Sequence, residues 1–187
     1  MPESRVRVLF DETTIARRCE ELAADIVAAA PKDLLVVAVL KGSFMFAADL
    51  IRALHRAGLA PQVEFMHLSS YRTGTVSTGQ VTILRDVESA IEGRDVLLVD
   101  DILESGRTLV FAKDLLAARG AKRVLSAVLL EKPGKRAVHI DADFVGFRCP
   151  DLFVVGYGMD IAHSYRQLPF VGVIDTTSTA PDLFEPT

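Results

Sequence analysis

The sequence predicts an α/β protein with a mostly parallel, twisted sheet flanked by helices. Short apolar runs alternate with helical stretches along the 187 residues, which is the order from which parallel sheets with right-handed crossovers are built. Residues 34–40 (LLVVAVL) and 95–99 (DVLLV) are apolar almost throughout, as expected of strands covered on both faces. The length suits one domain, and in such a sheet we expect the binding site beyond the carboxyl ends of the strands.

The first element is a predicted helix that runs to about Ala30. Asp11 or Thr13 can cap its start, and Pro31 ends it. Its apolar positions share one face: Ile15, Cys19, Leu22, Ile26 and Val27.

After the strand at 34–40, residues 43–57 are the next predicted helix, with Gly58 placed to end it. Residues 62–68 are a predicted strand. Residues 69–80 (SSYRTGTVSTGQ) are polar and show no periodicity, which predicts a long loop. Residues 81–84 are a candidate strand that returns across this loop and pairs with the strand before it.

The second half of the chain repeats the alternation. A helix is expected from Gly106 to Arg119, with Gly120 at its end. A helical turn is expected around residues 161–168, and the tail from Thr176 is expected to fray. The strands expected here are residues 95–99, 123–130, 144–147, 152–155 and 171–174.

Composition excludes several classes of protein. The net charge is −4 with both signs interspersed, whereas nucleic-acid binding usually leaves a basic face. No apolar run approaches the roughly 20 residues that span a bilayer, and the N-terminus shows no signal-peptide stretch. We therefore expect a cytoplasmic protein with no membrane partner. Cys19 and Cys149 lack metal-ligand spacing and are expected to be packing or bystander residues.

The most informative segment is residues 96–109, VLLVDDILESGRTL. A buried strand delivers Asp100 and Asp101 to its carboxyl end, and Ser105-Gly106-Arg107-Thr108 then opens a helix. Free amides at a helix N-terminus bind anions, and glycine lets the backbone approach the anion closely. Carboxylates accept from sugar hydroxyls, so a ribose phosphate fits this pattern.

This segment has simpler alternative interpretations. Ser105 could be an ordinary N-cap and the acids solvated strand-end charges, but two acids with Glu104 and a Ser-Gly-x-Thr run disfavour that reading. A P-loop is excluded because the chain has no G-x-x-x-x-G-K-[ST]. Gly156-Tyr157-Gly158 lacks the third small residue of a dinucleotide fingerprint.

Residues 96–109 resemble the 5-phosphoribosyl diphosphate (PRPP) signature of the type I phosphoribosyltransferases, and other motifs resemble those of the hypoxanthine-guanine branch. The resemblance runs from about Phe10 to Ile174. It implies a core at about residues 32–150, a hood formed by the N-terminal segment and about residues 151–175, and a flexible lid loop. It also implies transfer from PRPP to a 6-oxopurine, giving IMP or GMP and pyrophosphate, with Mg²⁺.

The resemblance assigns roles to the central motif. Asp100 and Asp101 would contact the ribose hydroxyls, directly or through Mg²⁺, and Glu104–Thr108 would hold the 5′-phosphate. Glu104 would handle the proton on purine N7. The family usually has Asp here, and the extra methylene of Glu moves the carboxylate by about 1.5 Å, so the role depends on reach.

Two further segments resemble the family's loops. Lys41 and Gly42 match the pyrophosphate loop, where a non-proline cis peptide precedes the Lys; without the resemblance this is an ordinary strand-to-helix turn. Ser70 and Tyr71 match the lid that excludes water from the reacting centre, and the alternative is a surface loop.

The purine side is assigned in the same way. Lys132 would donate to the exocyclic O6 of the purine, Phe153 would stack on the base, and the Val154 backbone would bond its edge. Asp160 would hold Mg²⁺ and Arg166 would bind pyrophosphate. Phe153 and Val154 could equally be core strand residues. Lys135 and Arg136 are expected to form a solvated basic turn. The four His residues show no ligand spacing and are expected at surface or packing positions.

Two rival functions stay open at this stage. One is a different purine preference, for hypoxanthine alone or including xanthine. The other is a regulator of the same fold that senses PRPP and binds nucleic acid, which the negative charge and the presence of Lys132 and Asp160 disfavour. Family members form homodimers or homotetramers, so we expect a homo-oligomer.

Overall fold

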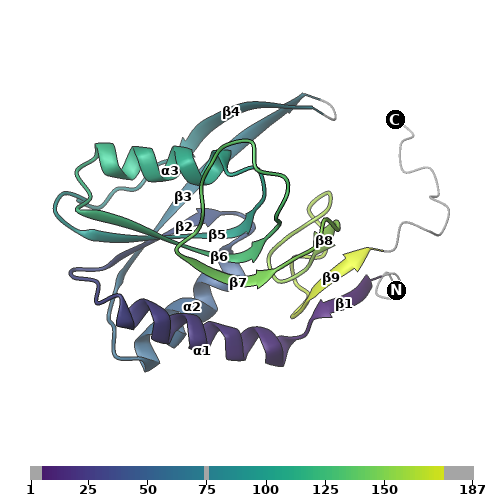
Figure 1. The fold of residues 1–187 in the computed structure, drawn as a ribbon, viewed down its shortest axis with the longest axis horizontal. Coiled ribbons are helices and arrows are strands. Elements are labelled where there is room, and N and C mark those ends of the chain that lie inside the picture. Colours follow the sequence, from purple (N-terminus) through teal and green to yellow (C-terminus); the bar gives the residue numbers. More distant parts are fainter. Residues whose placement is uncertain (1–5, 74–75, 175–187) are drawn as a thin grey trace.

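The structure, a computed structural model, describes residues 6–73 and 76–174, and between 70 and 80 it describes no side chains. Its main sheet has six strands in the order β4-β3-β2-β5-β6-β7 (Figure 1). All neighbours are parallel except β3 and β4, which confirms the predicted fold class. The strands are β2 (Leu35–Leu40), β3 (Gln62–Thr73), β4 (Val76–Arg85), β5 (Asp95–Leu103), β6 (Arg123–Glu131) and β7 (Phe144–Arg148).

Helices cover both faces of this sheet. α1 (Glu12–Ala28) and α2 (Phe44–Arg56) lie on one face and α3 (Arg107–Ala118) on the other (Figure 1). Along β2, Val36 and Ala38 pack in the cluster with α1 and α2, whereas Leu35 and Val37 pack in the cluster with α3. Because alternate residues of a strand point to opposite faces, this explains why the run is apolar without interruption. None of the helices described is long and apolar enough to cross a membrane.

The predicted helix ends are confirmed. The Asp11 carboxylate accepts a hydrogen bond from the Thr14 backbone N–H at 2.7 Å and caps α1. Gly58 and Gly120 follow α2 and α3 with φ of +95° and +86°, a backbone conformation that side chains other than glycine rarely adopt.

A second sheet, which we call the hood, has three antiparallel strands in the order β1-β9-β8. Its strands are β1 (Val6–Phe10), β9 (Val171–Ile174) and β8 (Val154–Val155). β1 was not predicted as a strand. Its pairing partner, β9, lies far away in the sequence, and Ile174 faces Val6. Residues near β1 in the sequence therefore give no indication of this pairing.

Two local predictions were wrong. The helical turn expected at 161–168 is a series of tight turns with isolated bridges and positive φ at Ala162, His163 and Tyr165. The strand expected at 152–155 is reduced to β8, because only Val154 and Val155 pair with β9.

The prediction of a long loop at 69–80 is also wrong, because β3 and β4 form a long hairpin that includes most of this segment. The pairing begins at His67 and Arg85 and continues to Thr73 and Val76. The returning strand at 81–84 is therefore confirmed within a longer β4, but it pairs mostly beyond residues 64–68 of β3, since Val81 faces Ser70 and Ile83 faces Leu68. The segment 69–80 is polar, and its strands pair through the backbone ladder, so no hydrophobic alternation predicted them.

Candidate active site

The candidate site lies where the strand order reverses. β2 has β3 on one side and β5 on the other, and binding sites in open α/β sheets form at such points. The loop after β2 touches the loop after β5: a Cβ on Gly42 would come within 1.6 Å of Asp101 Oδ2. Any side chain at position 42 would therefore displace the Asp101 carboxylate. The Leu40–Lys41 peptide is cis, as the resemblance implied.

Two adjoining cavities collect the predicted residues. The first, of about 480 Å³, lies around the end of β5 and the start of α3. The second, of about 890 Å³, lies between the β2 loop and the hood. Asp101, Ile102, Glu104 and Lys135 line both cavities, so a ligand that spanned the two would pass these four residues.

Nearly all of the predicted site residues line one cavity or the other. The first is lined by Asp100, Asp101, Glu104, Ser105, Gly106, Arg107 and Thr108. The second is lined by Lys41, Gly42, Lys132, Phe153, Val154, Asp160 and Arg166. The side chains of the predicted lid residues Ser70 and Tyr71 lie outside the described part of the structure. The preceding residue, Ser69, is described and lines the second cavity.

The acid pair is buried and closely coupled. The Asp101 backbone N–H donates to Asp100 Oδ1 at 2.9 Å, and the Ile102 N–H donates to Asp101 Oδ1 at 2.8 Å. Burial, reinforced by repulsion from Asp101, raises the pKa of Asp100 well above its ordinary value. Burial also raises the pKa of Asp101, against hydrogen bonds from Asp100 and Ile102 and the charge of Arg166. A cation beside this pair would relieve the cost of ionising it.

The donor set fits Mg²⁺ with a substrate present. Within the described ranges, no cluster of three or more His, Cys, Asp or Glu residues could hold a metal alone. Mg²⁺ commonly takes one or two carboxylates and completes its shell with substrate phosphates and water. Asp100 and Asp101 offer such carboxylates. The third predicted ligand, Asp160, lies in the second cavity and pairs with Arg166 Nη2 at 2.8 Å.

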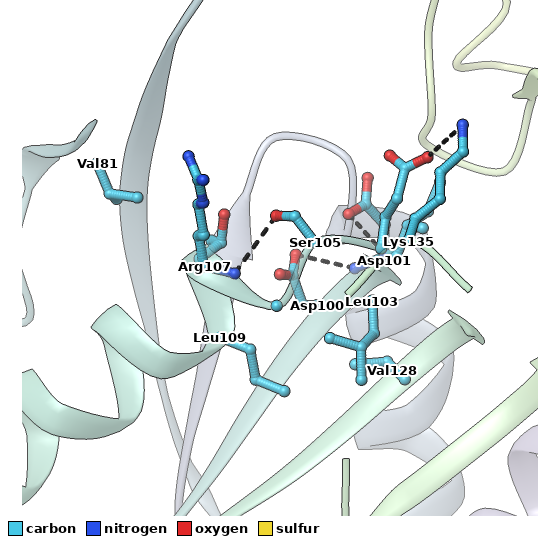
Figure 2. Close-up of a pocket in the computed structure, with 13 residues that line it drawn as sticks. Val81, Asp100, Asp101, Leu103, Ser105, Arg107, Leu109, Val128 and Lys135 are labelled. Atoms are coloured by element: carbon cyan, nitrogen blue, oxygen red, sulfur yellow. Dashed lines mark hydrogen bonds and ion pairs between the residues drawn. The ribbon is translucent and has the colours of Figure 1, made fainter. Parts of the chain in front are cut away.

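The loop before α3 is built to expose backbone amides. Gly106 has φ +82° and precedes the helix without a side-chain cap. The Ser105 hydroxyl accepts only a long contact, 3.4 Å, from the Arg107 N–H. Figure 2 shows Asp100 and Ser105 between Arg107 on one side of the pocket and Lys135 on the other. The amides and the acids therefore face one cavity.

The Glu104 carboxylate lies between two ammonium groups. Oε1 is 3.7 Å from Lys132 Nζ and 3.6 Å from Lys135 Nζ, and Lys135 also pairs with Asp151 at 2.6 Å. The hydrogen bond that Lys135 donates to the Asp151 carboxylate raises the pKa of Lys135, against the effect of burial. Sequence analysis missed Lys135 and Asp151. The available signal was Gly134, whose φ of +91° turns the chain back after Lys132.

Arg136 also departs from the expected solvated turn, because its guanidinium lies against backbone carbonyls at the end of β5. Two of the four His residues, His67 and His163, line the second cavity rather than serving only as surface or packing residues. Both cysteines are free and buried, and burial raises the pKa of Cys19 to about 11, as suits a packing role.

The hood supplies the remaining wall. Phe153 is 53% exposed at the second cavity, whereas Val154 is buried in β8. Arg166 Nη1 donates to the Gly158 carbonyl at 2.6 Å. A Cβ on Gly158 would lie 2.3 Å from the Gly42 carbonyl oxygen, so the loop that carries Asp160 touches the loop that follows β2.

Comparisons with known proteins give a consistent result. Residues 7–162 match the family described as the phosphoribosyl transferase domain. The hypoxanthine-guanine phosphoribosyltransferase of Bacillus subtilis is 43% identical over 169 residues, which are 90% of this chain and 92% of that protein. The hypoxanthine phosphoribosyltransferase of Escherichia coli is 41% identical over 172 residues, 90% of this chain and 95% of that protein.

A longer relative and a solved structure agree. The bifunctional protein TilS/HprT of Listeria innocua is 44% identical over 169 residues, but the chain spans only 26% of that protein's length. The crystal structure of a hypoxanthine phosphoribosyltransferase from Staphylococcus aureus superposes with a TM-score of 0.87 and 41% identity, covering 92% of this chain and 94% of that one. The chain therefore belongs to the phosphoribosyltransferase family and groups within it with the hypoxanthine-guanine phosphoribosyltransferases.

Proposed function

We propose that the protein transfers the 5-phosphoribosyl group from PRPP to hypoxanthine or guanine, giving IMP or GMP and pyrophosphate. The observation that carries this proposal is the contact between two cavities, one with buried acids beside exposed helix amides and the other with an aromatic ring and a buried lysine. A ribose phosphate suits the first and a purine with a diphosphate suits the second.

Each group would act on a different part of the substrates. Asp100 and Asp101 accept from the ribose hydroxyls, and the amides of residues 105–108 hold the 5′-phosphate. Lys41 and Arg166 place positive charge where the diphosphate leaves. Mg²⁺, bound by the acids and the diphosphate, would neutralise charge on the leaving group.

The purine side accounts for selectivity and proton transfer. The Lys132 ammonium can donate but not accept a hydrogen bond, which favours an oxo group over an amino group at purine C6. Phe153 stacks on the base, and the Val154 backbone bonds its edge. Glu104 takes the N7 proton, and its contacts with Lys132 and Lys135 hold the longer side chain in place.

Cellular context and assembly are proposed with it. We place the enzyme in the cytoplasm and expect a homodimer or homotetramer of one-domain chains, with Ser70 and Tyr71 in a lid. Phe65, Ile83 and Leu84 on the β3–β4 hairpin are exposed. Exposed apolar side chains that lie together often mark a protein–protein contact, which supports an oligomer.

The direct test is a spectrophotometric assay with PRPP, Mg²⁺ and each of hypoxanthine, guanine, xanthine and adenine. We expect product from hypoxanthine or guanine and none from adenine. Glu104→Gln keeps the shape of the side chain but cannot accept the proton, so kcat should fall by about 100-fold or more. The control is Glu21→Gln, at an exposed position of α1, which should match the wild type. Product from adenine alone, or from no base, would disprove the proposed activity, and full turnover by Glu104→Gln would remove Glu104 from the proton transfer.

A further inference from the structure

Arg136 lies beneath the loop that carries Glu104. Its side chain is only 20% exposed. Nη1 donates to the carbonyl oxygens of Leu103 at 3.0 Å and Glu104 at 2.9 Å. These are the last residue of β5 and the first residue beyond it, so the guanidinium fixes the point at which the strand becomes the phosphate loop.

The same guanidinium reaches the neighbouring strand and the loop that follows it. Nη1 also contacts the Lys132 carbonyl at 3.3 Å, and Nε donates to the Ile140 carbonyl at 3.1 Å. Nη2 pairs with Glu131 Oε1 at 2.7 Å, and the Glu131 side chain is 13% exposed. One planar group therefore joins the ends of β5 and β6 to the loop from 132 to 140.

The backbones tied together belong to two residues whose side chains face the cavities. Glu104 Oε1 and Lys132 Nζ are 3.7 Å apart, and their main-chain carbonyls share one donor. Hydrogen bonds from a charged donor are stronger than neutral ones, and the rigid fork of arginine fixes several acceptors at once. Arg136 itself lines neither cavity.

We propose that Arg136 is a positioning residue, which holds Glu104 and Lys132 in register so that proton transfer and purine binding occur in one geometry. This inference rests on the proposed function, because it assigns Arg136 an effect on turnover. Without the clamp, Glu104 and Lys132 would move independently, and displacement of about 1 Å at a reacting centre can cost on the order of 100-fold in rate.

Arg94 provides a matched control at the opposite end of the sheet. Its side chain is 10% exposed. It donates to the Asp33 carbonyl at 3.1 Å, the Ala90 carbonyl at 3.4 Å and Gln62 Oε1 at 2.8 Å. Asp33 and Gln62 lie where β2 and β3 begin, so Arg94 makes the same kind of clamp away from the candidate site.

The experiment compares the wild type with Arg136→Met, Arg136→Lys and Arg94→Met, measuring the melting temperature, kcat, and KM for hypoxanthine and for PRPP. Arg136→Met should lose at least about tenfold in kcat and raise KM for hypoxanthine more than KM for PRPP, because Lys41 and Arg166 are untouched. Arg136→Lys should recover part of kcat. Arg94→Met should lower the melting temperature but leave kcat unchanged.

Two outcomes separate this inference from the proposed function. An inactive wild type would sink the proposed function. An active wild type with an Arg136→Met variant that loses only stability, as Arg94→Met does, would overturn the positioning role. If Arg136→Met does not fold, Arg136→Lys decides: unchanged kcat and KM values overturn the inference, and a loss of kcat larger than in Arg94→Met supports it.

Discussion

Asp100 is a buried carboxylate that costs the fold stability. It is 7% exposed, and burial followed by repulsion from Asp101 raises its pKa. A raised pKa means that the ionised form is disfavoured in the folded state. The destabilisation is therefore complete at high pH and disappears as the pH falls to the unfolded value of about 4.

Asp100→Asn should accordingly stabilise the folded protein while lowering its proposed enzymatic activity. At pH 8 we expect the free energy of unfolding to rise by roughly 1 kcal/mol, the size often gained when a destabilised functional position is relieved. The gain should shrink as the pH approaches 4. Urea unfolding at several pH values measures this, and Asp143→Asn, at an acid whose pKa is lowered by Lys113 and Ser126 against its burial, should show the opposite sign. A stability loss in Asp100→Asn at pH 8 would contradict the inference that ionised Asp100 destabilises the fold.

At the residue scale, the sequence predicted motifs better than contacts. Asp100–Thr108 could be identified because a strand, two acids and a helix start are adjacent in the chain. The positions of Lys135 and Arg136 could not, since both follow the Gly134 turn and are set by contacts distant in the chain. Lys135 pairs with Glu104 and Asp151, and Arg136 donates to the carbonyls of Leu103 and Glu104.

Asp95 joins three elements at the amino end of the sheet. It begins β5, and its Oδ2 accepts from the Lys32 N–H before β2 and from Arg123 Nη2 at the start of β6, each at 2.7 Å. Burial raises the pKa of Asp95, but these hydrogen bonds outweigh it and lower the pKa overall. A lowered pKa stabilises the fold above the unfolded value of about 4, and this stabilisation is lost as the pH falls through the folded value.

Asp95→Asn should therefore cost about 2 kcal/mol at pH 7, the range for hydrogen bonds to a charged group. The difference from the wild type should narrow between pH 5 and pH 3. Asp86→Asn is the control, because the Asp86–Arg119 pair lies at the surface and such pairs contribute less than about 1 kcal/mol. Equal losses in the two variants would show that Asp95 does not link the elements.

At the element scale, the helices and the parallel strands could be predicted from local signals. The helices carry capping residues and an apolar face, and the strands are short continuous apolar runs. The strand β1 and the full length of the β3–β4 hairpin could not, although the strands at 171–174 and 81–84 were expected. β1 is defined by its pairing with β9, and the hairpin by a backbone ladder. Neither interaction leaves a local pattern in side-chain polarity.

At the scale of the whole molecule, the hood and the main sheet share one hydrophobic cluster. Val154, Val171 and Val173 of the hood pack in the same cluster as the buried faces of α1 and α2. The rings of Phe10 in β1 and Phe147 in β7 stack with centroids 4.3 Å apart. A shared core of this kind favours one cooperative unit, which is what the single-domain prediction requires.

Tyr157 offers a way to test that unity. It lies between β8 and Asp160, is 6% exposed, and its hydroxyl donates to the Asp49 carboxylate of α2. Tyr157→Phe removes this bond to a charged group and should cost about 1.5 kcal/mol, or roughly 3–6 °C in melting temperature for a chain of this size. Tyr165→Phe, whose hydroxyl has no hydrogen-bond partner in the described part of the chain, should melt like the wild type.

Because hood and core share a cluster, far-UV and near-UV circular dichroism should report one coincident transition in all three proteins, shifted as a whole in Tyr157→Phe. An early transition confined to the near-UV signal, with the far-UV midpoint unmoved, would mean that the hood detaches and folds apart from the main sheet.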